Sequence, residues 1–526
     1  MYIMFVRLQL KINRLLLVLY KYNRRIAMRG IDTQTKKIRE QVFEEVARAA
    51  YSTGDVSHEL EEIPYKITPS DVPLYRESIW RERAIASERV RLAMGLSLRP
   101  LDRPVHITEG FAESNISEKY YEPPLMQVIP SACDMCEDNK IEVSNMCHGC
   151  VAHPCMEVCP KEAISMVDGH AFVDQDKCIK CGKCIAICPY HAIIKKIRPC
   201  AEACGINAIE SDEHGRAKIN DEKCVSCGQC MASCPFGAIA DKSQIFQMIR
   251  AIQHGDEVIA EIAPAFEGQF GADVTPAQVI AALKECGFKD VHEVALGADI
   301  GAVSEAHHVK EVVNGDLPFL LTSCCPAWSM LAKKYFPDII DSVSQELTPM
   351  VATARSIKKK YPNSKVVFIG PCAAKKLEAS RRTVRSDVDF VITFEELNAI
   401  FKAKNIDFSK YDKGRSMHEA TGAGRGYAVA GGVISAIEQC IEEYYPGTEV
   451  QTEHCEGLAE CKKMLLLAKA GKKDGCMIEG MGCPGGCVAG VGTILPINKA
   501  KLAVAKTVKE STTKLPAKDL LEIELP

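Results

Sequence analysis

Short apolar runs alternate with longer amphipathic stretches over the second half of the chain. Residues 258–262, 317–321, 365–370 and 388–392 are apolar runs rich in β-branched residues, and each has the length of one buried strand. Between the first two runs, Thr275 and Pro276 form a favoured start for a helix that extends to Gly287. Strands that alternate with helices predict an α/β domain with parallel sheets over residues 243–526.

The pattern before residue 131 is different. Residues 33–50 and 74–94 have helical periodicity, and residues 29–130 hold no cysteine, so we expect a helical docking or packing segment. Residues 1–28 mix apolar and basic residues, and their longest apolar run, 15–20, is too short for a signal peptide or for a membrane span of ~20 residues. We expect them to be an extension from a misassigned start, with Met28 the true initiator.

Two further stretches have a simple interpretation. Residues 421–432 are rich in glycine, but no lysine and serine follow at the offset of a P-loop, so we expect close packing there and no phosphate site. The lysine-rich residues after Ile497 predict one surface helix and an extended end.

Composition limits the kind of function. A chain of 526 residues has room for several domains, and its net charge of −4 favours neither a nucleic-acid-binding nor a membrane-surface role. Cysteine is the exception, with 26 copies. CxxC and CxxxCP spacings in so large a chain indicate metal ligation, whereas a small secreted domain would form disulfides. We therefore expect a reducing compartment, the cytoplasm of an anaerobic cell.

Sixteen cysteines between residues 133 and 234 have the spacing of iron–sulfur ligands. Two runs are bacterial ferredoxin motifs, Cys178-x2-Cys181-x2-Cys184-x3-Cys188 and Cys224-x2-Cys227-x2-Cys230-x3-Cys234, and a third is a looser version, Cys147-x2-Cys150-x4-Cys155-x3-Cys159. In this motif three close thiolates hold one [4Fe–4S] cubane, and the fourth cysteine ligates the neighbouring cluster. Residues 131–242 are therefore predicted to form ferredoxin-like α+β modules.

The spacing also predicts how the ligands are shared. The runs that begin at Cys147 and Cys178 form one two-cluster unit by exchanging their fourth ligands. The remaining cysteines form two more sets, Cys204 with Cys224, Cys227 and Cys230, and Cys133, Cys136 and Cys200 with Cys234. Four sets of four predict four accessory [4Fe–4S] clusters. A repeat after the closing cysteines, at residues 160–164, 189–193, 205–209 and 235–239, supports this assignment.

Cys324 and Cys325 directly follow the apolar run 317–321, in the sequence TSCCPAW at 322–328. Neighbouring side chains leave the backbone in different directions, so the pair suits one thiolate bound to iron and one free thiol. Taken alone, two buried structural thiols explain the pair equally well. Two later stretches favour the metal: GPCAAKK at 370–376 ends a predicted strand on Cys372, and EGMGCPGGCVAG at 479–490 places Cys483 and Cys487 among small residues.

These three stretches resemble the signature motifs of the [FeFe]-hydrogenases, in order and in separation, and are most similar to those of the divergent group B. The resemblance implies parallel sheets in two lobes around a buried metal cluster, the H-cluster. In that family the H-cluster is a [4Fe–4S] cubane joined to a two-iron subsite with CO, CN⁻ and an azadithiolate, inserted by maturation enzymes. It implies that Cys325, Cys372, Cys483 and Cys487 hold the cubane, with Cys487 bridging to the subsite.

The resemblance also implies a proton path. Cys324 is expected to be the free thiol that passes protons to and from the cofactor, and Glu305 and Ser344 match the next two members. The family's second glutamate falls on His308, which lies on the same helix face as Glu305 and titrates near neutrality. An ordinary surface histidine is an equally good interpretation of His308.

Other positions carry weaker implications. Lys375 matches the lysine that donates to a cyanide ligand, and Lys376 is expected to face solvent. Ala265, Ala327 and Gly370 differ from the residues common in the family and are expected around the cofactor. Five cysteines match no family role and are expected to be buried or solvent thiols: Cys286, Cys440, Cys455, Cys461 and Cys476.

The implied function is the reversible reaction 2H⁺ + 2e⁻ ⇌ H₂, with ferredoxin or a similar small carrier as the electron partner. One alternative is a hydrogen-sensing regulatory homologue, which usually carries an appended sensor domain that this sequence does not show. The other is a non-catalytic iron–sulfur assembly or scaffold protein. Such relatives typically lose one cysteine of the pair that Cys324 and Cys325 form here.

Overall fold

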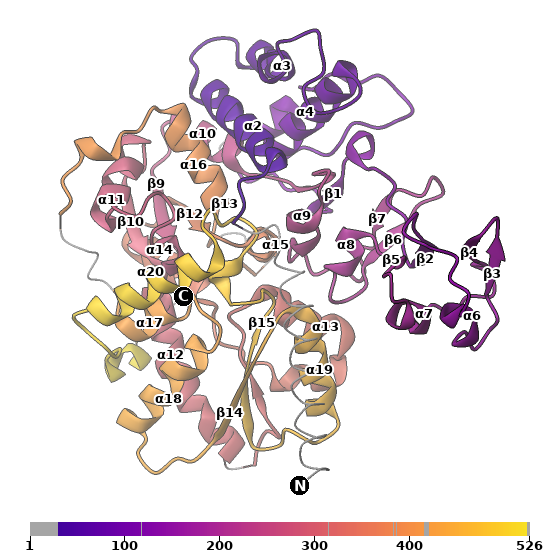
Figure 1. Ribbon diagram of the computed structural model, residues 1–526. Coiled ribbons are helices and arrows are strands. Elements are labelled where there is room, and N and C mark those ends of the chain that lie inside the picture. The colour runs from indigo at the N-terminus through magenta and orange to yellow at the C-terminus, as the bar shows by residue number, and fades with distance from the viewer. Residues whose placement is uncertain are drawn as a thin grey trace.

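The computed structural model describes residues 30–522 except 117, 314, 382, 385, 386 and 415–419, so the expectation about residues 1–28 lies outside it. Its C-terminal half contains two parallel sheets (Figure 1). The larger has the order β10-β9-β12-β13, with strands Asp290–Glu293, Val258–Ile262, Lys365–Gly370 and Phe390–Thr393. The smaller has the order β11-β15-β14, with strands Leu320–Leu321, Cys476–Met481 and Gln451–Glu456. The predicted α/β architecture in two lobes is confirmed.

Helices pack on both sheets and join the two lobes. The larger sheet contacts α10 (Ile245–Gln253), α11 (Pro276–Glu285), α14 (Pro349–Lys360) and α16 (Phe394–Ala403). The smaller contacts α12 (Val294–Val313), α13 (Pro326–Tyr335), α18 (Gly432–Tyr444) and α19 (Leu458–Lys469). Helix α12 packs against both α14 and α18 and so spans the two lobes.

Two predicted elements of this half can be compared directly with the structure. Helix α11 begins as predicted, because Thr275 and Gln278 form a capping box at its N-terminus. The strand predicted at 317–321 is shorter, with only Leu320 and Leu321 in β11. Pro318 has no N–H to donate to a ladder, and its carbonyl accepts instead from the N–H of Gly475, just before β15, at 2.7 Å.

The N-terminal region is a three-helix layer of α2 (Gln34–Tyr51), α3 (Val56–Ile67) and α4 (Ile79–Ala93) that covers the larger lobe (Figure 1). Helix α2 matches the helix predicted at residues 33–50 to within one residue at each end, with Thr33 as its N-cap, and packs on α10 and α16. The second predicted helix begins later, at Ile79, because the preceding turn directs the N–H groups of Tyr75 and Arg76 onto the Glu82 carboxylate, at 2.8 and 2.7 Å. Helix α3 was not predicted. The apolar faces of these helices share one core with the larger sheet, as expected for a packing segment.

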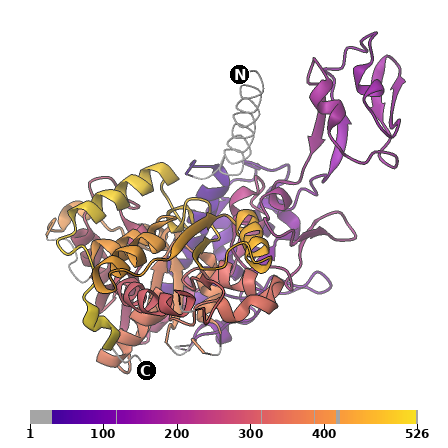
Figure 2. The same cartoon turned by 90° about the horizontal axis from the view of Figure 1, so that it is seen from below.

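The ferredoxin-like region contains two-stranded antiparallel sheets and short helices, and its outer part projects from the body as an arm (Figure 2). The strand pairs are Lys140–Val143 with Ile193–Lys196 (β2, β5), Ile164–Val167 with His170–Val173 (β3, β4), Ile209–Ser211 with Ala217–Ile219 (β6, β7) and Met126–Val128 with Ile239–Asp241 (β1, β8). The helices are α6 (Pro154–Glu157), α7 (Lys183–Ile187), α8 (Pro199–Glu202) and α9 (Gln229–Ser233). The predicted α+β modules are confirmed.

The remaining elements connect these parts. They are α5 (Phe111–Ser114), α15 (Ala373–Ala379), α17 (Gly422–Gly426), α20 (Ile497–Glu510) and the short 3₁₀ helices Pro130–Ala132, Pro264–Phe266, Pro337–Ser342, Phe408–Lys410, Cys487–Ala489 and Lys518–Glu522. The glycine-rich stretch is a place of close packing, as predicted, because a Cβ on Gly432 would lie 2.0 Å from the carbonyl oxygen of Gly426. Among the helices of the described residues, none combines the length and the apolar character that a membrane crossing requires.

Candidate metal centre

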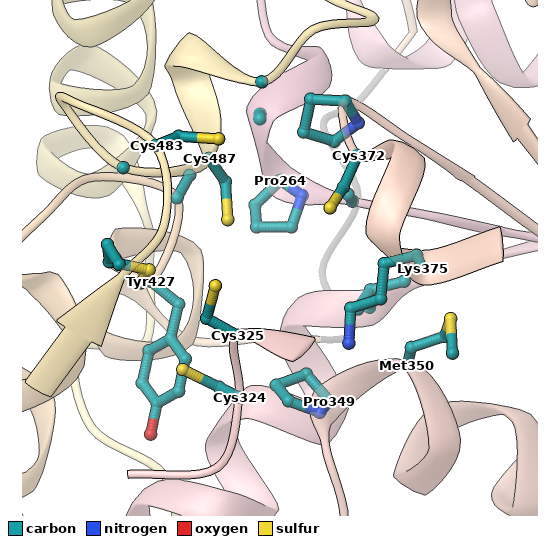
Figure 3. A pocket seen from close by; sticks show the side chains of 18 of the residues that line it. Pro264, Cys324, Cys325, Pro349, Met350, Cys372, Lys375, Tyr427, Cys483 and Cys487 are labelled. Carbon is teal, nitrogen blue, oxygen red and sulfur yellow. The ribbon is translucent and has the colours of Figure 1, made fainter. Parts of the chain in front are cut away.

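A cavity lies where strands of both sheets end. Five cysteines line it: Cys324, Cys325, Cys372, Cys483 and Cys487. They surround a single space together with the side chain of Lys375 (Figure 3). Parallel α/β sheets commonly place their sites at the carboxyl ends of the strands.

Each of these cysteines stands just after a strand. Cys325 follows β11 and is the N-cap residue of α13, and Cys372 follows β12 and is the N-cap residue of α15. Cys483 and Cys487 follow β15 on a glycine-rich turn. The four line one cavity, and there burial first, and then Cys372, Cys325 and Cys483, raise the pKa of the Cys487 thiol well above its ordinary value. Four thiols that repel ionisation in this way suit a cationic metal partner.

The small residues of the third motif are required by close approach. A Cβ on Gly480 would lie 2.0 Å from the indole ring of Trp328, and a Cβ on Gly490 would lie 2.3 Å from the carbonyl oxygen of Pro371. The N–H of Gly482 donates to Sγ of Cys325 at 3.3 Å. The last contact brings a backbone donor against a cysteine sulfur, as is typical of iron–sulfur sites.

The cavity does not suit a single metal ion. Over the described residues, no three cysteine, histidine or carboxylate side chains converge on one point that an ion could occupy. The four thiols instead enclose a space, which fits a cluster whose corners each take one sulfur. The shape of the donor set therefore agrees with a multinuclear group.

Lys375 supplies a positive charge at the wall of this cavity. Burial opposes its charged form, but Glu378 outweighs that effect with the neighbouring thiols and raises the pKa of Lys375. Its Nζ lies 2.7 Å from a Glu378 carboxylate oxygen and has no second hydrogen-bond acceptor in the described part of the chain. A buried ammonium with donors to spare fits an anionic or strongly accepting group in the cavity.

Lys376 does not face solvent, which corrects the expectation from the sequence. Its side chain is 2% exposed, and its Nζ lies 2.7 Å from Asp241 and 2.8 Å from Glu396. Successive residues on a helix point about 100° apart. The side of α15 away from the cavity is also buried, because Lys376 there meets Asp241 of β8 and Glu396 of α16.

The accessory cysteines of each predicted set lie near one another in the structure. Burial, and then Cys234, Cys133 and Cys136, act on the Cys200 thiol and raise its pKa to about 12. In the same way, burial and then Cys227, Cys224 and Cys204 raise the pKa of the Cys230 thiol. In the arm, Cys155 lies beside Cys150 and Cys188, and Cys159 lines a small space with Cys178, Cys181 and Cys184. Occupation of each set by a cluster stays a prediction.

The repeat after the closing cysteines has a structural cause. The N–H of the alanine four residues on donates to the cysteine sulfur: Ala163 to Cys159 at 3.3 Å, Ala208 to Cys204 at 3.2 Å and Ala238 to Cys234 at 3.4 Å. Such N–H···S bonds stabilise thiolates that carry cluster charge. The turn that makes this bond therefore recurs with its sequence.

The innermost accessory set borders the cavity. Cys483 is among the groups that raise the pKa of Cys227, after burial, and Gln229, two residues after Cys227, donates its side-chain amide to the Cys483 sulfur at 3.4 Å. A Cβ on Gly228 would lie 2.7 Å from the side chain of Val491, in the segment that follows Cys487. The loop that carries Cys227 therefore contacts the loop that carries Cys483 and Cys487, and this contact joins the ferredoxin-like region to the cavity.

The residues of the expected proton path come from three elements. Cys324 lies at the cavity wall, and burial raises the pKa of its thiol well above the ordinary value. Glu305, on α12, is 5% exposed; burial raises its pKa to about 7, partly offset by a hydrogen bond with Ser344. Ser344 is held beside β11 because its N–H donates to the carbonyl oxygen of Leu321 at 2.8 Å. His308, on α12, lies at the surface end of this group.

Two residues near this path were not predicted. Oε1 of Glu346 lies 3.1 Å from Nδ1 of His308. Tyr427 stands beside Cys324 at the cavity (Figure 3), and its buried hydroxyl has no hydrogen-bond partner in the described residues. The signal for Tyr427 was one aromatic residue within a glycine-rich stretch; Glu346 had none, because only the fold brings it to α12.

The five cysteines without an expected role were predicted to be either buried or solvent thiols, and all five are buried. They are Cys286, Cys440, Cys455, Cys461 and Cys476. Cys455 and Cys461 lie beside each other, with sulfur atoms 3.7 Å apart.

Of the positions that differ from the family, Ala265 lines the cavity, and Ala327 lies against it, 3.0 Å from a Cβ built on Gly482. At Gly370 a Cβ would lie 2.4 Å from the ring of Phe368.

Known proteins share both parts of this arrangement. Residues 256–491 match the family described as iron only hydrogenase large subunit, C-terminal domain, and residues 147–198 and 194–245 match the LdpA Fe-S cluster-binding domain. The periplasmic [Fe] hydrogenase large subunit of Nitratidesulfovibrio vulgaris is 30% identical over 396 residues, which are 65% of this chain and 89% of that protein.

Two further relatives differ in kind. Iron hydrogenase 1 of Clostridium pasteurianum is 28% identical over 387 residues, 63% of this chain and 67% of that protein. The cytosolic Fe-S cluster assembly factor NAR1 of Kluyveromyces lactis is 37% identical over 92 residues, 18% of this chain and 20% of that protein. The extensive match to the periplasmic enzyme and the family match over the cavity lead to one conclusion: this chain is an iron–sulfur protein that belongs to the iron-only hydrogenase family.

Proposed function

We propose that this protein is an [FeFe]-hydrogenase that interconverts protons and H₂. The observation that carries the proposal is the pair Cys324 and Cys325 at the cavity wall, opposite Cys372, Cys483 and Cys487. Four thiols suffice for a cubane, so the fifth is left free beside the place where the reaction would occur. In this proposal residues 243–526 form the catalytic domain, residues 131–242 carry electrons, and residues 29–130 are a packing segment.

The ligands of the cofactor follow from this arrangement. Cys325, Cys372, Cys483 and Cys487 would hold the cubane, and Cys487 would bridge to the two-iron subsite. The bound H-cluster supplies the redox chemistry that joins protons and electrons. Lys375 would donate an ionic hydrogen bond to an anionic ligand of the subsite, because its ammonium is buried at the cavity wall and has donors to spare.

The protein supplies the protons. Cys324 would exchange a proton with the cofactor on one side and with Glu305 on the other. The pKa of Glu305 is raised by burial to about 7, so near neutral pH the carboxyl group both accepts and releases a proton readily. The hydroxyl of Ser344 would pass the proton onward, because its oxygen can accept one proton while the hydroxyl donates the proton that it already carries.

Electrons would reach the cavity through four accessory [4Fe–4S] clusters. The proposed ligand sets lead from the arm, where Cys181 is exposed, to Cys227, which neighbours Cys483. A ferredoxin or a similar small carrier in the cytoplasm would deliver them, and maturation enzymes would insert the two-iron subsite.

A second candidate is an iron–sulfur assembly protein, favoured by the similarity to NAR1. Maturation of the protein under anaerobic conditions, followed by hydrogen evolution from reduced methyl viologen, separates the candidates. Turnover together with CO and CN⁻ infrared bands supports the enzyme. Bands with very weak turnover indicate a hydrogen sensor. A matured protein with neither bands nor turnover would contradict the enzyme and favour assembly.

A further inference from the structure

A histidine and a carboxylate meet at the surface of α12, beyond the expected proton path from Cys324. Nδ1 of His308 lies 3.1 Å from Oε1 of Glu346. His308 follows Glu305 by three residues on the same helix, whereas Glu346 lies on the loop between the 3₁₀ helix Pro337–Ser342 and α14. The side chains of His308 and Glu346 are 36% and 24% exposed, and Glu305 is 5% exposed. The pair therefore spans the step from the buried carboxyl group to solvent.

Hydrogen bonds fix Glu346 both to the loop that carries Cys324 and to helix α12. Its N–H donates to Oγ of Ser344 at 3.2 Å, and its carbonyl oxygen accepts from Oγ of Ser323, next to Cys324, at 3.0 Å. Its carboxylate also receives a hydrogen bond from Ser304 on α12. A loop tied at three points holds its carboxylate in a defined place, which proton transfer over hydrogen-bond distances requires.

The members of the group also interact electrostatically. After burial and the bond from Ser344, the charge of Glu346 raises the pKa of Glu305, and His308 lowers it. The hydrogen bond from His308, more than any other contact, lowers the pKa of Glu346. From other elements, Cys324 and Tyr427 face Glu305 as well. The protonation of Glu305 therefore depends on the charges of Glu346 and His308.

The neighbouring histidine is oriented differently. Nδ1 of His307 lies 3.1 Å from the hydroxyl of Tyr445, on the segment after α18. His307 is thus an imidazole on the same helix, next to His308 in sequence, with a different hydrogen-bond partner. It serves as a matched control.

We propose that His308 and Glu346 together form the outer relay of the proton path, with the carboxylate that the resemblance placed on α12 supplied instead by the loop. This inference rests on the proposed hydrogenase function. In the inward direction, His308 takes a proton from solvent at one ring nitrogen and releases one from Nδ1 to the Glu346 carboxylate. The proton then passes by way of Ser344 to Glu305 and Cys324. Each transfer forms one bond to hydrogen and breaks another, so no charge accumulates over a complete passage.

The first test measures hydrogen evolution of the matured enzyme. Glu346→Gln and His308→Ala are each expected to lower the rate by about 10²-fold, the low end of the range for a positioned proton-transfer group. The double variant should lose little more than the stronger single variant, because the residues act in series. Added imidazole should restore part of the rate of His308→Ala, with a pH profile that follows the buffer. His307→Ala should keep the full rate.

The second test does not depend on turnover. The infrared band of the protonated Glu305 carboxyl group, identified by its loss in Glu305→Gln, should fade as the pH rises. Glu346→Gln removes a negative charge and should move the midpoint to lower pH, whereas His308→Asn should move it to higher pH. His307→Asn should leave it in place. The unmatured protein suffices for this measurement.

The outcomes separate the two proposals. An active wild type whose Glu346→Gln and His308→Ala variants are equally active would overturn the relay and leave the hydrogenase intact. Unchanged infrared midpoints in both variants would also overturn it. A matured wild type with neither activity nor cofactor bands would overturn the proposed function and, with it, the relay.

Discussion

The side-chain amide of Gln229 donates a hydrogen bond to Sγ of Cys483 at 3.4 Å. Gln229 is the first residue of α9, two positions after Cys227, and Cys483 lies at the cavity. The bond therefore joins the innermost accessory ligand set to the proposed catalytic cubane across 254 residues of sequence. A donor to a ligand sulfur stabilises the reduced, more negative cluster, which raises its reduction potential.

Replacing this donor should make the catalytic cubane harder to reduce. A net hydrogen bond contributes about 0.5–1.5 kcal/mol, and 59 mV corresponds to about 1.4 kcal/mol for one electron. Gln229→Leu is thus expected to lower the midpoint potential of this cubane by roughly 20–60 mV. An EPR-monitored redox titration of the unmatured protein measures the shift. Gln439→Leu, at an exposed position on α18, is the control, and equal potentials in all three proteins would remove the role of Gln229.

The two adjacent cysteines should fail in different ways. Cys324→Ala is expected to keep the cofactor, as iron content and CO and CN⁻ infrared bands report, and to lower hydrogen evolution by ~10²–10⁴-fold, the range for a positioned proton-transfer group. Cys325→Ala should lose a ligand of the cubane and prevent stable insertion of the cofactor. Near-full activity of Cys324→Ala with an intact cofactor would contradict the proton path.

Iron content tests the number of clusters. Twenty cysteines in five sets of four predict about twenty iron atoms in the unmatured, anaerobically reconstituted protein, at four per cubane. Cys200→Ala should lower the content by at most about four atoms, because it removes one ligand of one set. Cys440→Ala, at a buried cysteine outside every set, should leave the content unchanged. A wild-type content of about twelve would remove two of the clusters.

Glu305 should make stability depend on pH. Its pKa is raised by burial from 4.5 to about 7, so in this window the folded protein keeps a proton that the unfolded chain has lost. The stabilisation is complete below about pH 4.5 and is lost as the pH rises through about 7. Relative to Glu305→Gln, the wild type should lose about 3 kcal/mol of unfolding free energy over this range, at 1.36 kcal/mol per pKa unit.

Urea unfolding of both proteins at several pH values measures this difference. Other buried carboxyl groups with raised pKa values, such as Asp299 and Glu267, are present in both proteins, so their effects cancel. A difference between the two proteins that does not change with pH would mean that Glu305 is ionised in the fold.

The buried cluster of Lys376, Asp241 and Glu396 should be essential for stability. Lys376→Met keeps most of the packing but leaves two buried carboxylates without their cation, which costs about 3–5 kcal/mol. Urea or thermal unfolding should show the loss. Lys333→Met, at an exposed position on α13, should change stability by less than about 0.5 kcal/mol. If Lys376→Met unfolds like the wild type, the two carboxyl groups are protonated in the fold.

The sequence alone determined the features whose physics is local. Ferredoxin ligands lie two or three residues apart, so the spacing of Cys224, Cys227 and Cys230 is enough to predict a loop that would hold one cubane. Two other features depend only on neighbours along the chain, and the structure contains both. They are the alternation of apolar runs with helices and the helix start at Thr275 and Pro276.

Only the tertiary structure decided where more distant residues meet. Lys376 has the composition of a surface residue, and its burial follows from Asp241 and Glu396, which belong to elements that fold against α15. Glu346 reaches His308 because residues 343 and 344 pair beside β11 and tie their loop to α12. Periodicity shows which residues of an element share a face, but the partner of that face depends on packing between elements, and pairs such as Gln229 and Cys483 leave no trace in the local sequence.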